Sequence, residues 1–582
     1  MCGIVGYSGV RRAAPVLLEG LEKLEYRGYD SAGIAVCDGG VIRIAKKKGR
    51  VKEIAQAADF NGSVGIGHTR WATHGKPSER NAHPHVYGKF AIVHNGIIEN
   101  ATELKEECLA RGESFASETD SEVLVHLVAA CYRGNFLQAV SEGLRRCQGS
   151  YAVAVLCEDF PDEIVCARGG SPLVVGVKEG ETFIASDLAA IASERAEVYV
   201  AEEGEFVCVK AGSAVFYDRN LVVKQKERLQ YDYNGDSPEK MGFRHFMQKE
   251  MSEIPSVLKK SKLILSNREF YKVLCQTKYI DIIACGTAYH SGLCAKYAFE
   301  SLCRVKTEAS IASEYRYCNP IVGKKSLVIA VSQSGETADT LAAAALAKER
   351  GAYLAAVTNV PYSSLTRLAD CVLPTDAGFE VAVAATKSFN AQLALLYSLA
   401  DLRSGGGGEW LKGADALAER VLEVSEGVRA WTPYFLNAKS VYFIGRGVDY
   451  CTALEGSLKL KEITYLPSEG YPAGELKHGT LALVDEGTPV VAIITQKALA
   501  EKTMNAVHET HARGARVFLV TSLPECAEHP EVTASVVIPA CREIFSPVLS
   551  VIPLQKLAYY VSIARGIDPD KPRNLAKSVT VE

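Results

Sequence analysis

Met1-Cys2-Gly3-Ile4-Val5-Gly6 opens the chain, and a small residue at position 2 allows Met1 to be removed. Cys2 would then carry a thiol and a free α-amine side by side. An α-amine titrates near ~8 and a thiol near ~8.5, so the amine can accept the thiol proton at neutral pH. The resulting thiolate is a strong nucleophile. The segment therefore predicts an N-terminal nucleophile followed by a buried strand, and an ordinary buried cysteine is the alternative on these residues alone.

The composition is that of a large globular protein from a reducing compartment. Its 582 residues are enough for about three or four domains. A formal charge of −4 without a basic stripe argues against a nucleic-acid partner. No apolar run is expected to span a membrane, and Arg11 and Arg12 come too early for a signal peptide. The 17 cysteines include no Cys-x-x-Cys pair, which indicates thiols and a cytoplasmic location rather than disulfides.

The first domain is expected to cover residues 1–225. Its β-rich runs are 33–36, 64–67, 90–93, 151–156 and 173–175, and its helical patterns are 15–24 and 122–131. Many strands with few helices indicate stacked antiparallel sheets covered by helices.

Within this domain, polar groups concentrate in residues 68–100. Five histidines fall there, but no carboxylate or thiol spacing completes a set of metal ligands, so a metal site is not predicted. Arg70 can bind a carboxylate through two parallel N–H donors. Asn95-Gly96 offers an amide and a flexible N–H, which suit an oxyanion hole, and a hairpin turn is the alternative. Asp120 suits a substrate amine or, equally, a helix cap.

Five motifs of this domain occur together in one known family. They are Cys2-Gly3-Ile4-Val5-Gly6, Tyr26-Arg27-Gly28-Tyr29-Asp30-Ser31, His68-Thr69-Arg70-Trp71-Ala72-Thr73-His74-Gly75, His94-Asn95-Gly96 and Ser117-Glu118-Thr119-Asp120. In them the domain resembles the class II glutamine amidotransferases, which have the N-terminal-nucleophile hydrolase fold, an αββα sandwich. The resemblance implies that Cys2 attacks the amide carbon of glutamine while Asn95 and Gly96 hold the oxyanion. It also implies a glutamine site formed by Arg70, Trp71, Thr73, His74 and Asp120.

A polar stretch at 226–252, broken at Asn234-Gly235-Asp236, is expected to link this domain to the rest. Two segments, 253–403 and 409–566, then repeat one β-α pattern on either side of a flexible glycine run. The predicted strands are 279–284, 326–331 and 353–357 in the first copy, and 441–444, 489–494 and 517–520 in the second. Each copy predicts a doubly wound α/β domain whose ligand crevice lies at the carboxyl ends of parallel strands.

A loop rich in hydroxyl groups, Ser332-Gln333-Ser334-Gly335-Glu336-Thr337, joins a predicted strand to a helix. Free N–H groups at a helix start bind anions, and without a Walker lysine the loop suits a sugar phosphate better than a nucleotide. A plain serine-rich cap is the alternative. This half resembles the sugar isomerase (SIS) family, in which the loop holds phosphate. The resemblance implies a sugar-phosphate site made of Cys285, Gly286, Thr287, Ser332, Gln333, Ser334, Thr337, Val383 and Ala576.

The second copy carries Glu455, Lys459 and Glu462 at a spacing that places all three on one helical face. They predict either a surface ion-pair ladder, worth ~0.2–0.5 kcal/mol per pair, or a carboxylate base beside a cation. A glycine-bounded loop offers His478, and the tail 567–582 carries Lys577 among apolar residues, so we expect the tail to dock.

From end to end the chain resembles the isomerising glutamine–fructose-6-phosphate aminotransferases. The resemblance implies that ammonia from glutamine is delivered to fructose 6-phosphate, giving glucosamine 6-phosphate. Ammonia needs a dry channel between the two sites, and Trp71, in the loop that carries Arg70, is large enough to gate it; a tryptophan that packs in a core is the alternative. His478 from the other subunit of a homodimer would open the sugar ring, and Lys577 would form a Schiff base with C2. Glu462, with Lys459 beside it, would move a proton between C1 and C2 of the sugar. No metal or organic cofactor is implied. Ala288 stands where the family has serine, which puts one phosphate contact of ~1 kcal/mol in question.

Three alternatives make other demands on the sequence. A phosphoribosyltransferase needs a hydroxyl-rich loop where Leu483-Val484-Asp485-Glu486 stands, and an asparagine synthetase needs a Ser-Gly-Gly-x-Asp-Ser loop, which Ser404-Gly405-Gly406 does not continue. A sugar-phosphate sensor without chemistry would not need Glu462, His478 and Lys577 together.

Overall fold

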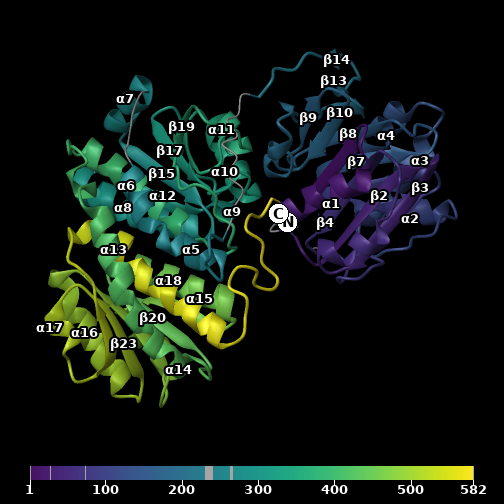
Figure 1. Cartoon of the computed structure of the whole chain (residues 1–582). Coiled ribbons are helices and arrows are strands. Elements are labelled where there is room, and N and C mark those ends of the chain that lie inside the picture. Colours follow the sequence, from purple (N-terminus) through teal and green to yellow (C-terminus); the bar gives the residue numbers. More distant parts are fainter. Residues whose placement is uncertain (1, 26–27, 73, 230–239, 262–266, 581–582) are drawn as a thin grey trace. The chain divides into compact units, whose positions relative to one another are not determined.

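The computed structural model describes residues 2–25, 28–72, 74–229, 240–261 and 267–580. Several sequence predictions lie outside these residues, namely the removal of Met1, Tyr26 and Arg27 of the second motif, the glutamine-site residue Thr73, and the break at Asn234-Gly235-Asp236. The chain divides into two compact units, Met1–Ser237 with Ser578–Glu582, and Pro238–Lys577 (Figure 1). Each unit is described by itself.

The first unit contains two antiparallel sheets of seven strands each. The first sheet runs in the order β11 (Glu197–Val200), β9 (Val174–Lys178), β10 (Glu181–Ala185), β1 (Gly3–Ser8), β4 (Val64–Arg70), β2 (Ser31–Asp38) and β3 (Val41–Lys48). The second runs in the order β14 (Val223–Lys224), β13 (Ser213–Tyr217), β12 (Phe206–Lys210), β8 (Ile164–Gly169), β7 (Gly149–Cys157), β6 (Phe90–Ile98) and β5 (His85–Tyr87). The strand that follows Cys2 is therefore the central strand of the first sheet.

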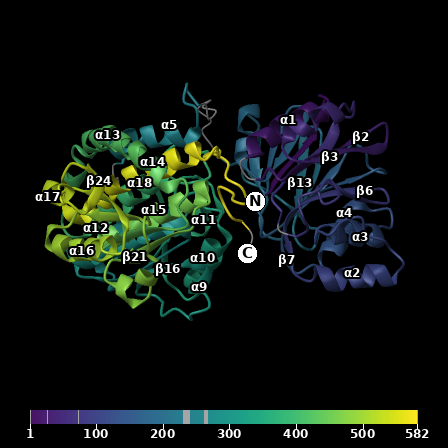
Figure 2. The ribbon, with the colours of Figure 1, turned by 90° about the horizontal axis from the view of Figure 1, so that it is seen from below.

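Three apolar layers hold this unit together. Between the sheets, Ile4 of β1 packs in one cluster with Val93 of β6 and Ala154 of β7. Helix α1 (Ala13–Leu24) covers the outer face of the first sheet, and α2 (Ala101–Ala110), α3 (Glu122–Cys131) and α4 (Phe136–Leu144) cover the second. Figure 2 shows α1 on one side, α3 and α4 on the other, and the strands between them. The predicted αββα sandwich is confirmed.

The second unit contains two parallel sheets of five strands with the same strand order. The first is β16 (Lys306–Ile311), β15 (Tyr279–Ala284), β17 (Ser326–Val331), β18 (Tyr353–Thr358) and β19 (Cys371–Pro374). The second is β21 (Ser468–Pro472), β20 (Val441–Gly445), β22 (Pro489–Ile494), β23 (Arg516–Thr521) and β24 (Val532–Val537). In each sheet the first strand lies between the second and the third, which is the doubly wound arrangement. The predicted pair of doubly wound domains is confirmed.

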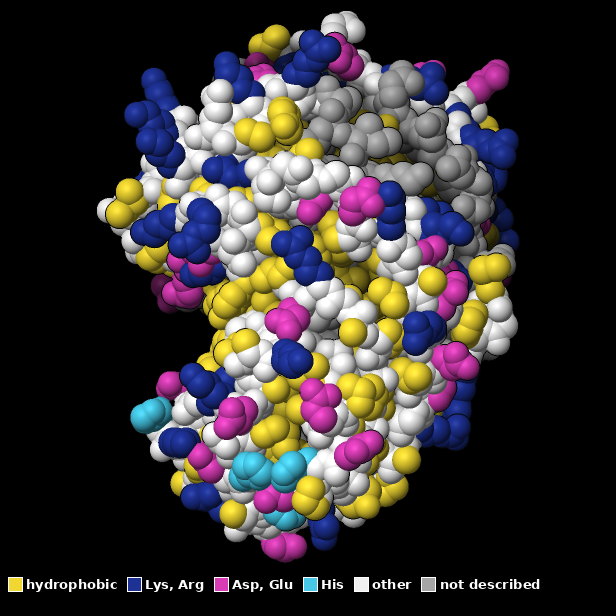
Figure 3. Space-filling view, turned by 90° about the vertical axis from the view of Figure 1, so that its left-hand side faces the viewer, with side chains coloured by type: hydrophobic (Ala, Val, Ile, Leu, Met, Phe, Trp, Pro, Cys, Tyr) yellow, Lys and Arg dark blue, Asp and Glu magenta, His cyan; other side chains and the backbone are white. Residues whose placement is uncertain are grey.

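Helices shared by both sheets make the second unit one body. Its main helices are α5 (Phe246–Ser252), α6 (Ile254–Lys260), α7 (Arg268–Gln276), α8 (Gly286–Cys303), α10 (Ala338–Glu349), α12 (Lys387–Arg403), α13 (Ala414–Val424), α15 (Val448–Thr464), α16 (Lys497–His511) and α18 (Pro547–Ala564). Figure 1 shows α15 and α18 between the two sheets. One apolar cluster joins Ile282 of β15, Phe443 of β20 and Leu554 of α18. On the face in Figure 3, basic and acidic side chains are interspersed.

By length and composition, one stretch of the described chain, Glu543–Ala564, could cross a membrane. The prediction that no apolar run is long enough to do so was therefore wrong. The most apolar window of this stretch has a mean hydropathy of 1.3, and 83% of that window is buried inside the unit. Such burial is what the central helix of a large apolar core shows.

The crossing of α15 and α18 generates a prediction about stability. A Cβ at Gly456 would lie 2.5 Å from Leu554 Cδ1 and 3.1 Å from Phe443 Cε1, both in the core. Gly456→Ala should therefore overpack the core and lower the free energy of unfolding of the second unit by about 1–3 kcal/mol. The measurement is the calorimetric unfolding transition of the full chain.

The matched control is Gly427→Ala in the helical turn Ser425–Trp431. Its nearest neighbour for a new Cβ is Val536 Cγ2 at 3.7 Å, an ordinary contact. Alanine should there be neutral or stabilising by about 0.4–1 kcal/mol. Equal destabilisation by both substitutions would contradict the packing argument.

Candidate active sites

Strand pairing holds Cys2 beside the end of β4. The next residue, Gly3, pairs with Thr69, and a Cβ at Gly3 would lie 2.7 Å from Thr69 Oγ1, so the close approach requires glycine. The Cys2 thiol lies 3.6 Å from the carbonyl oxygen of Trp71, to which it donates, and 3.4 Å from the Trp71 N–H, from which it accepts. The candidate nucleophile is thus held by the backbone of the loop that follows Arg70.

Burial raises the pKa of the Cys2 thiol, and the Trp71 N–H and the positive charge of Arg70 oppose that rise. The thiol is therefore protonated at rest at neutral pH. A nucleophile in this state needs a proton acceptor at the moment of attack. The free α-amine predicted from the sequence would supply one.

A neutral histidine orients the amide of Asn95. His68 Nε2 lies 3.0 Å from the carbonyl oxygen of His94 and 3.1 Å from Asn95 Oδ1. Burial lowers the pKa of His68 well below its usual value, so the ring is neutral. Because a carbonyl oxygen only accepts, Nε2 carries the proton and donates to both oxygens. The Asn95 amide nitrogen must then point the other way, and it donates to the Cys2 carbonyl oxygen at 3.1 Å.

Gly96, the second predicted oxyanion residue, follows Asn95 on β6 and pairs with Tyr151 of β7. Its φ is +140°, and a Cβ there would lie 1.9 Å from the Ser150 carbonyl oxygen, so only glycine fits. Asn95-Gly96 is therefore part of β6, the strand next to the edge strand β5, and the alternative of a hairpin turn is wrong.

Arg70 and Asp120 offer groups of opposite charge near Cys2. Arg70 is 4% exposed; its Nη2 donates to the carbonyl oxygens of His74 and, at 3.1 Å, of Gly75. Its Nη1 is buried and has no hydrogen-bond partner within the described residues. Asp120 Oδ2 accepts the Ile98 N–H at 2.9 Å, and Oδ1 lies 3.9 Å from His74 Nδ1. Asp120 does not cap α3, whose N-cap is Ser121, so that alternative is wrong.

In the second unit, the hydroxyl-rich loop lies at the carboxyl end of β17 and leads into α10. Ser332 Oγ lies 2.9 Å from Thr337 Oγ1 and accepts the Gly335 N–H at 3.0 Å. Gly335 has a φ of +64°, and a Cβ there would lie 2.0 Å from Ser363 Oγ. The loop is thus folded by its own hydroxyls. It lies where the chain order of the sheet reverses between β15 and β17, the place at which such sheets bind ligands.

A buried ionic network joins the two copies. Lys459 and Glu455 of α15 are both fully buried, and Lys459 Nζ lies 3.4 Å from Glu455 Oε1 and 2.7 Å from Glu462 Oε2. The Thr287 hydroxyl of α8 donates to Glu455 Oε1 at 3.0 Å and accepts from Lys459 Nζ at 2.9 Å. His290 Nδ1 lies 2.7 Å from Glu455 Oε2. The alternative of a surface ladder is therefore wrong.

The network sets the charge of its members. Burial alone would lower the pKa of Lys459, but Glu455 and Glu462 raise it to about 12. Burial raises the pKa of Glu462, and Lys459 opposes this rise. Glu462 alone of the three reaches solvent, with 20% of its side chain exposed. It is therefore a carboxylate of raised basicity at an accessible edge, next to a permanent cation.

The tail docks on the second unit up to Lys577. Asp570 accepts the N–H groups of Phe246 and Met247, each at 2.8 Å, and its carbonyl oxygen accepts the Val383 N–H at 3.1 Å. Lys577 forms an ion pair with Glu380, whose side chain is fully buried. Although burial raises the pKa of Glu380, Lys577 and the Ser388 hydroxyl lower it to about 2. Glu380 had no sequence signal, because it lies in an irregular loop without a motif.

The other predicted residues are placed individually. The Gln333 carbonyl oxygen accepts the Asn359 N–H at 3.1 Å, and Ser334 Oγ accepts the Glu336 N–H at 3.2 Å. Cys285 Sγ lies 3.9 Å from Thr340 Oγ1, and the next residue, Gly286, begins α8. Ala576 is partly exposed. His478 ends the 3-10 turn Glu475–His478 and is exposed. Within the described residues, no hydrogen bond or ion pair joins His478 to Glu462 or Lys577. The structure therefore groups predicted residues around Cys2 in the first unit and around Lys459 in the second, and His478 belongs to neither group.

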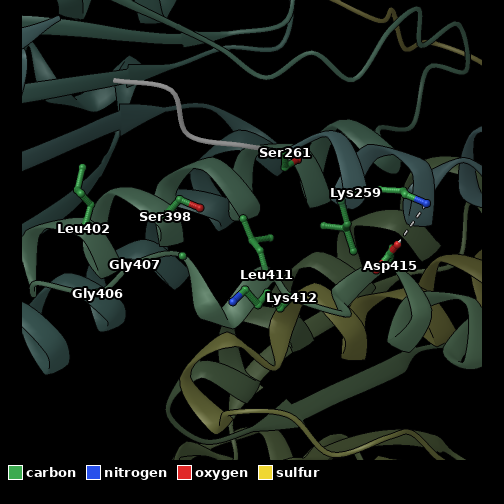
Figure 4. A pocket seen from close by; sticks show the side chains of 11 residues that line it. Lys259, Ser261, Ser398, Leu402, Gly406, Gly407, Leu411, Lys412 and Asp415 are labelled. Atoms are coloured by element: carbon green, nitrogen blue, oxygen red, sulfur yellow. Dashed lines mark ion pairs between the residues drawn. The ribbon is translucent and has the colours of Figure 1, made fainter. Parts of the chain in front are cut away.

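A cavity of about 450 Å³ lies elsewhere in the second unit (Figure 4). Its lining includes Gly406, Gly407 and Leu411, and an ion pair of 4.0 Å between Lys259 and Asp415. It contains none of the predicted site residues, so we do not assign the reaction to it.

Comparison with known proteins yields the same division. The SIS domain model matches residues 273–402 and 434–565, and the glutamine amidotransferase domain model matches residues 68–193. Isomerizing glutamine–fructose-6-phosphate aminotransferases of Clostridium tetani and Aquifex aeolicus are 46% and 44% identical to the chain, over the full length of each. A solved C-terminal domain of the glucosamine-fructose-6-phosphate aminotransferase from Francisella tularensis is 37% identical, with a TM-score of 0.55, and covers 58% of this chain and 100% of its own.

The buried network generates a prediction of its own. Lys459→Met should leave Glu455 buried without its cation, so the second unit should lose about 3–5 kcal/mol of stability. Calorimetry of the full chain measures this loss. Lys461→Met, which removes an exposed lysine of the same helix, should change stability by less than about 0.5 kcal/mol. A similar, small effect of both substitutions would refute the structural role of the network.

Proposed function

The chain belongs to the isomerizing glutamine–fructose-6-phosphate aminotransferase family, and from this premise we propose which residues carry the reaction. As a member of that family it is an enzyme that converts fructose 6-phosphate to glucosamine 6-phosphate, releasing glutamate from glutamine, in the first step of amino-sugar synthesis. Family membership excludes the phosphoribosyltransferase, the asparagine synthetase and the sensor without chemistry.

In the glutaminase half, Cys2 Sγ attacks the amide carbon of glutamine, and the tetrahedral adduct expels ammonia as the thioester forms. Water then hydrolyses the thioester and releases glutamate. The oxyanion is held by Asn95 Nδ2 and the Gly96 N–H. The observation that carries this assignment is the pair of hydrogen bonds of the Asn95 amide, from His68 Nε2 to its oxygen and from its nitrogen to the Cys2 carbonyl oxygen, which directs the nitrogen towards Cys2. Preorganised donors of this kind are among the largest contributions to catalysis.

The substrate glutamine needs one partner for each of its charges. Arg70 Nη1, which is buried and has no hydrogen-bond partner in the described part of the chain, is proposed to bind the α-carboxylate. Asp120 Oδ1, the oxygen not used by Ile98, is proposed to bind the α-amine. Trp71, Thr73 and His74 follow Arg70 in the sequence and are proposed to close over the substrate.

In the isomerase half, the sugar phosphate is proposed to bind Ser332, Gln333, Ser334 and Thr337, with Cys285, Gly286, Val383 and Ala576 around it. Thr287 would position Glu455 and Lys459 rather than bind the phosphate, because its hydroxyl already donates to Glu455 and accepts from Lys459. Glu462 is proposed to move the proton between C1 and C2. Its raised pKa makes it a better base than an ordinary carboxylate, and Lys459 beside it keeps the carboxylate ionised until it accepts the proton.

Lys577 is proposed to form the Schiff base with C2, losing water from the carbonyl carbon. Its amine lies in the ion pair with Glu380, so it must leave that carboxylate before it attacks. His478 is proposed to open the ring in the neighbouring subunit of a homodimer, which its exposure supports. A cytoplasmic location is supported by the 17 cysteines, all of which are free.

The first test separates the two halves of the reaction. Cys2→Ala should reduce glutamine hydrolysis by on the order of 10⁶-fold, as removal of a nucleophile does in a well-studied protease. Synthesis of glucosamine 6-phosphate from fructose 6-phosphate and a high concentration of ammonia should persist. Both products are measured with purified enzyme. Loss of ammonia-dependent synthesis in folded Cys2→Ala enzyme would show that the assignment of separate roles is wrong.

The second test concerns the shared site. Lys577→Ala and His478→Ala subunits are each expected to be inactive in synthesis. In a mixed dimer one of the two sites would contain both residues, so mixing should restore part of the activity. Isolated heterodimers without activity would contradict a His478 supplied by the partner. Glutamine hydrolysis, which neither residue serves, is the internal control for correct folding.

A further inference from the structure

Two histidines and a glutamate converge on the second copy, away from the groups assigned to the reaction. His508 lies in the last turn of α16, and His529 and Glu531 lie in the turn that precedes β24. One ligand atom from each of the three lies within 4.8 Å of the other two. His508 Nδ1 is in direct contact with Glu531 Oε2. Figure 3 shows histidine and acidic side chains gathered on the lower part of that face, where α16 and α17 lie.

The backbone around the three residues is well fixed. His529 and Glu531 flank Pro530, whose ring restricts the backbone between them. The Val532 N–H donates to the His529 carbonyl oxygen at 3.0 Å, and the Glu531 N–H lies 3.4 Å from His529 Nδ1. The rings of His508 and His529 meet edge to face, with centroids 4.9 Å apart. The three donors therefore need only small side-chain rotations to share one ion.

Two imidazoles and one carboxylate form a donor set that zinc and its neighbours in the first transition row accept in proteins. The side chains of His508 and Glu531 are 41% and 29% exposed, so an ion can enter and retain a water ligand. With neutral imidazoles the cluster carries one negative charge, which favours a dication. We propose that His508, His529 and Glu531 form a binding site for a divalent transition-metal ion of the Zn²⁺ class.

The position of the site gives it a consequence for catalysis. Glu509, the residue after His508, pairs with Lys477 at 2.7 Å, and Lys477 precedes His478. A bound ion ties the last turn of α16 to the turn before β24, the edge strand of the sheet. It thereby fixes Glu509 and, through Lys477, the 3-10 turn that presents His478. This step rests on the proposed role of His478, whereas binding of the ion does not.

Binding is tested on the full-length enzyme, freed of metal by chelation and titrated with Zn²⁺ and Co²⁺ alone. Equilibrium dialysis should find one Zn²⁺ per chain that His508→Ala holds at least about 10-fold more weakly, because even outer partners of a metal site contribute that much. The matched control is His511→Ala, an exposed histidine of the same helix outside the cluster, which should bind as wild type does. Bound Co²⁺ should show d–d bands without a thiolate charge-transfer band.

Three outcomes would overturn the site: equal Zn²⁺ binding by wild type and His508→Ala, equal loss in His511→Ala, or a thiolate band that moves the ion to one of the 17 cysteines. Glu531→Gln, which keeps size and removes charge, is the second variant should His508→Ala fold poorly. Its binding should be weakened to a similar degree, and unchanged binding would count against the carboxylate as a ligand. The thermal midpoint should rise with Zn²⁺ in wild type and not in these variants.

The coupling to His478 is tested separately by ammonia-dependent synthesis, which does not use Cys2. Zn²⁺ should change kcat in wild type, with a smaller change in KM for fructose 6-phosphate, since His478 acts on bound sugar. In Lys477→Ala the ion should still bind but leave kcat unaltered. An equal effect of Zn²⁺ on kcat in both enzymes would refute the coupling and leave the binding site intact.

Discussion

The buried ammonium of Lys459 is the group around which the second unit is arranged. A cation without solvent is tolerated only where opposite charges and hydrogen bonds replace its water, and three side chains supply them: Glu455, Glu462 and Thr287. Because Thr287 comes from α8 and the others from α15, satisfying one charge also fixes the two copies against each other. The same demand leaves Glu462 at the edge of the network, partly exposed and with a raised pKa, which is the state that proton transfer requires.

In the first unit, a buried group is neutral rather than charged: the imidazole of His68. Four buried histidines surround the end of β4, and burial lowers the pKa of His68 and His83 well below the usual value. A neutral His68 donates through one nitrogen to two oxygens, and so decides which way the Asn95 amide points. Desolvation of the histidine therefore serves the geometry of the proposed oxyanion hole directly.

The regular elements of this chain could be predicted from its sequence because apolar runs and glycine breaks mark them. The runs 279–284, 326–331 and 489–494 coincide with β15, β17 and β22, and 122–131 coincides with α3. Strand β3 was missed because it is a lysine-rich edge strand whose exposed residues give no apolar run. The site residues taken from motifs stay predictions, whereas Glu380 was not predicted at all, since its importance comes only from the distant Lys577 that it meets. His68 lay within a motif, but its hydrogen bond to Asn95 could not be predicted, because it forms only when β4 of one sheet packs against β6 of the other.

The shared strand order of the two copies has a consequence for the contact between them. Helices α8 and α15 are equivalent elements, each being the first helix after the first strand of its sheet, and they contact each other through Thr287 and Glu455. A contact between equivalent elements is what a two-fold symmetric dimer has at its centre. The second unit thus contains, within one chain, a contact of the kind that a homodimer of one such domain would have. Within one chain the two sides of this contact need not be identical, as they must be in a homodimer, and here one copy carries the hydroxyl loop while the other carries Glu455, Lys459 and Glu462.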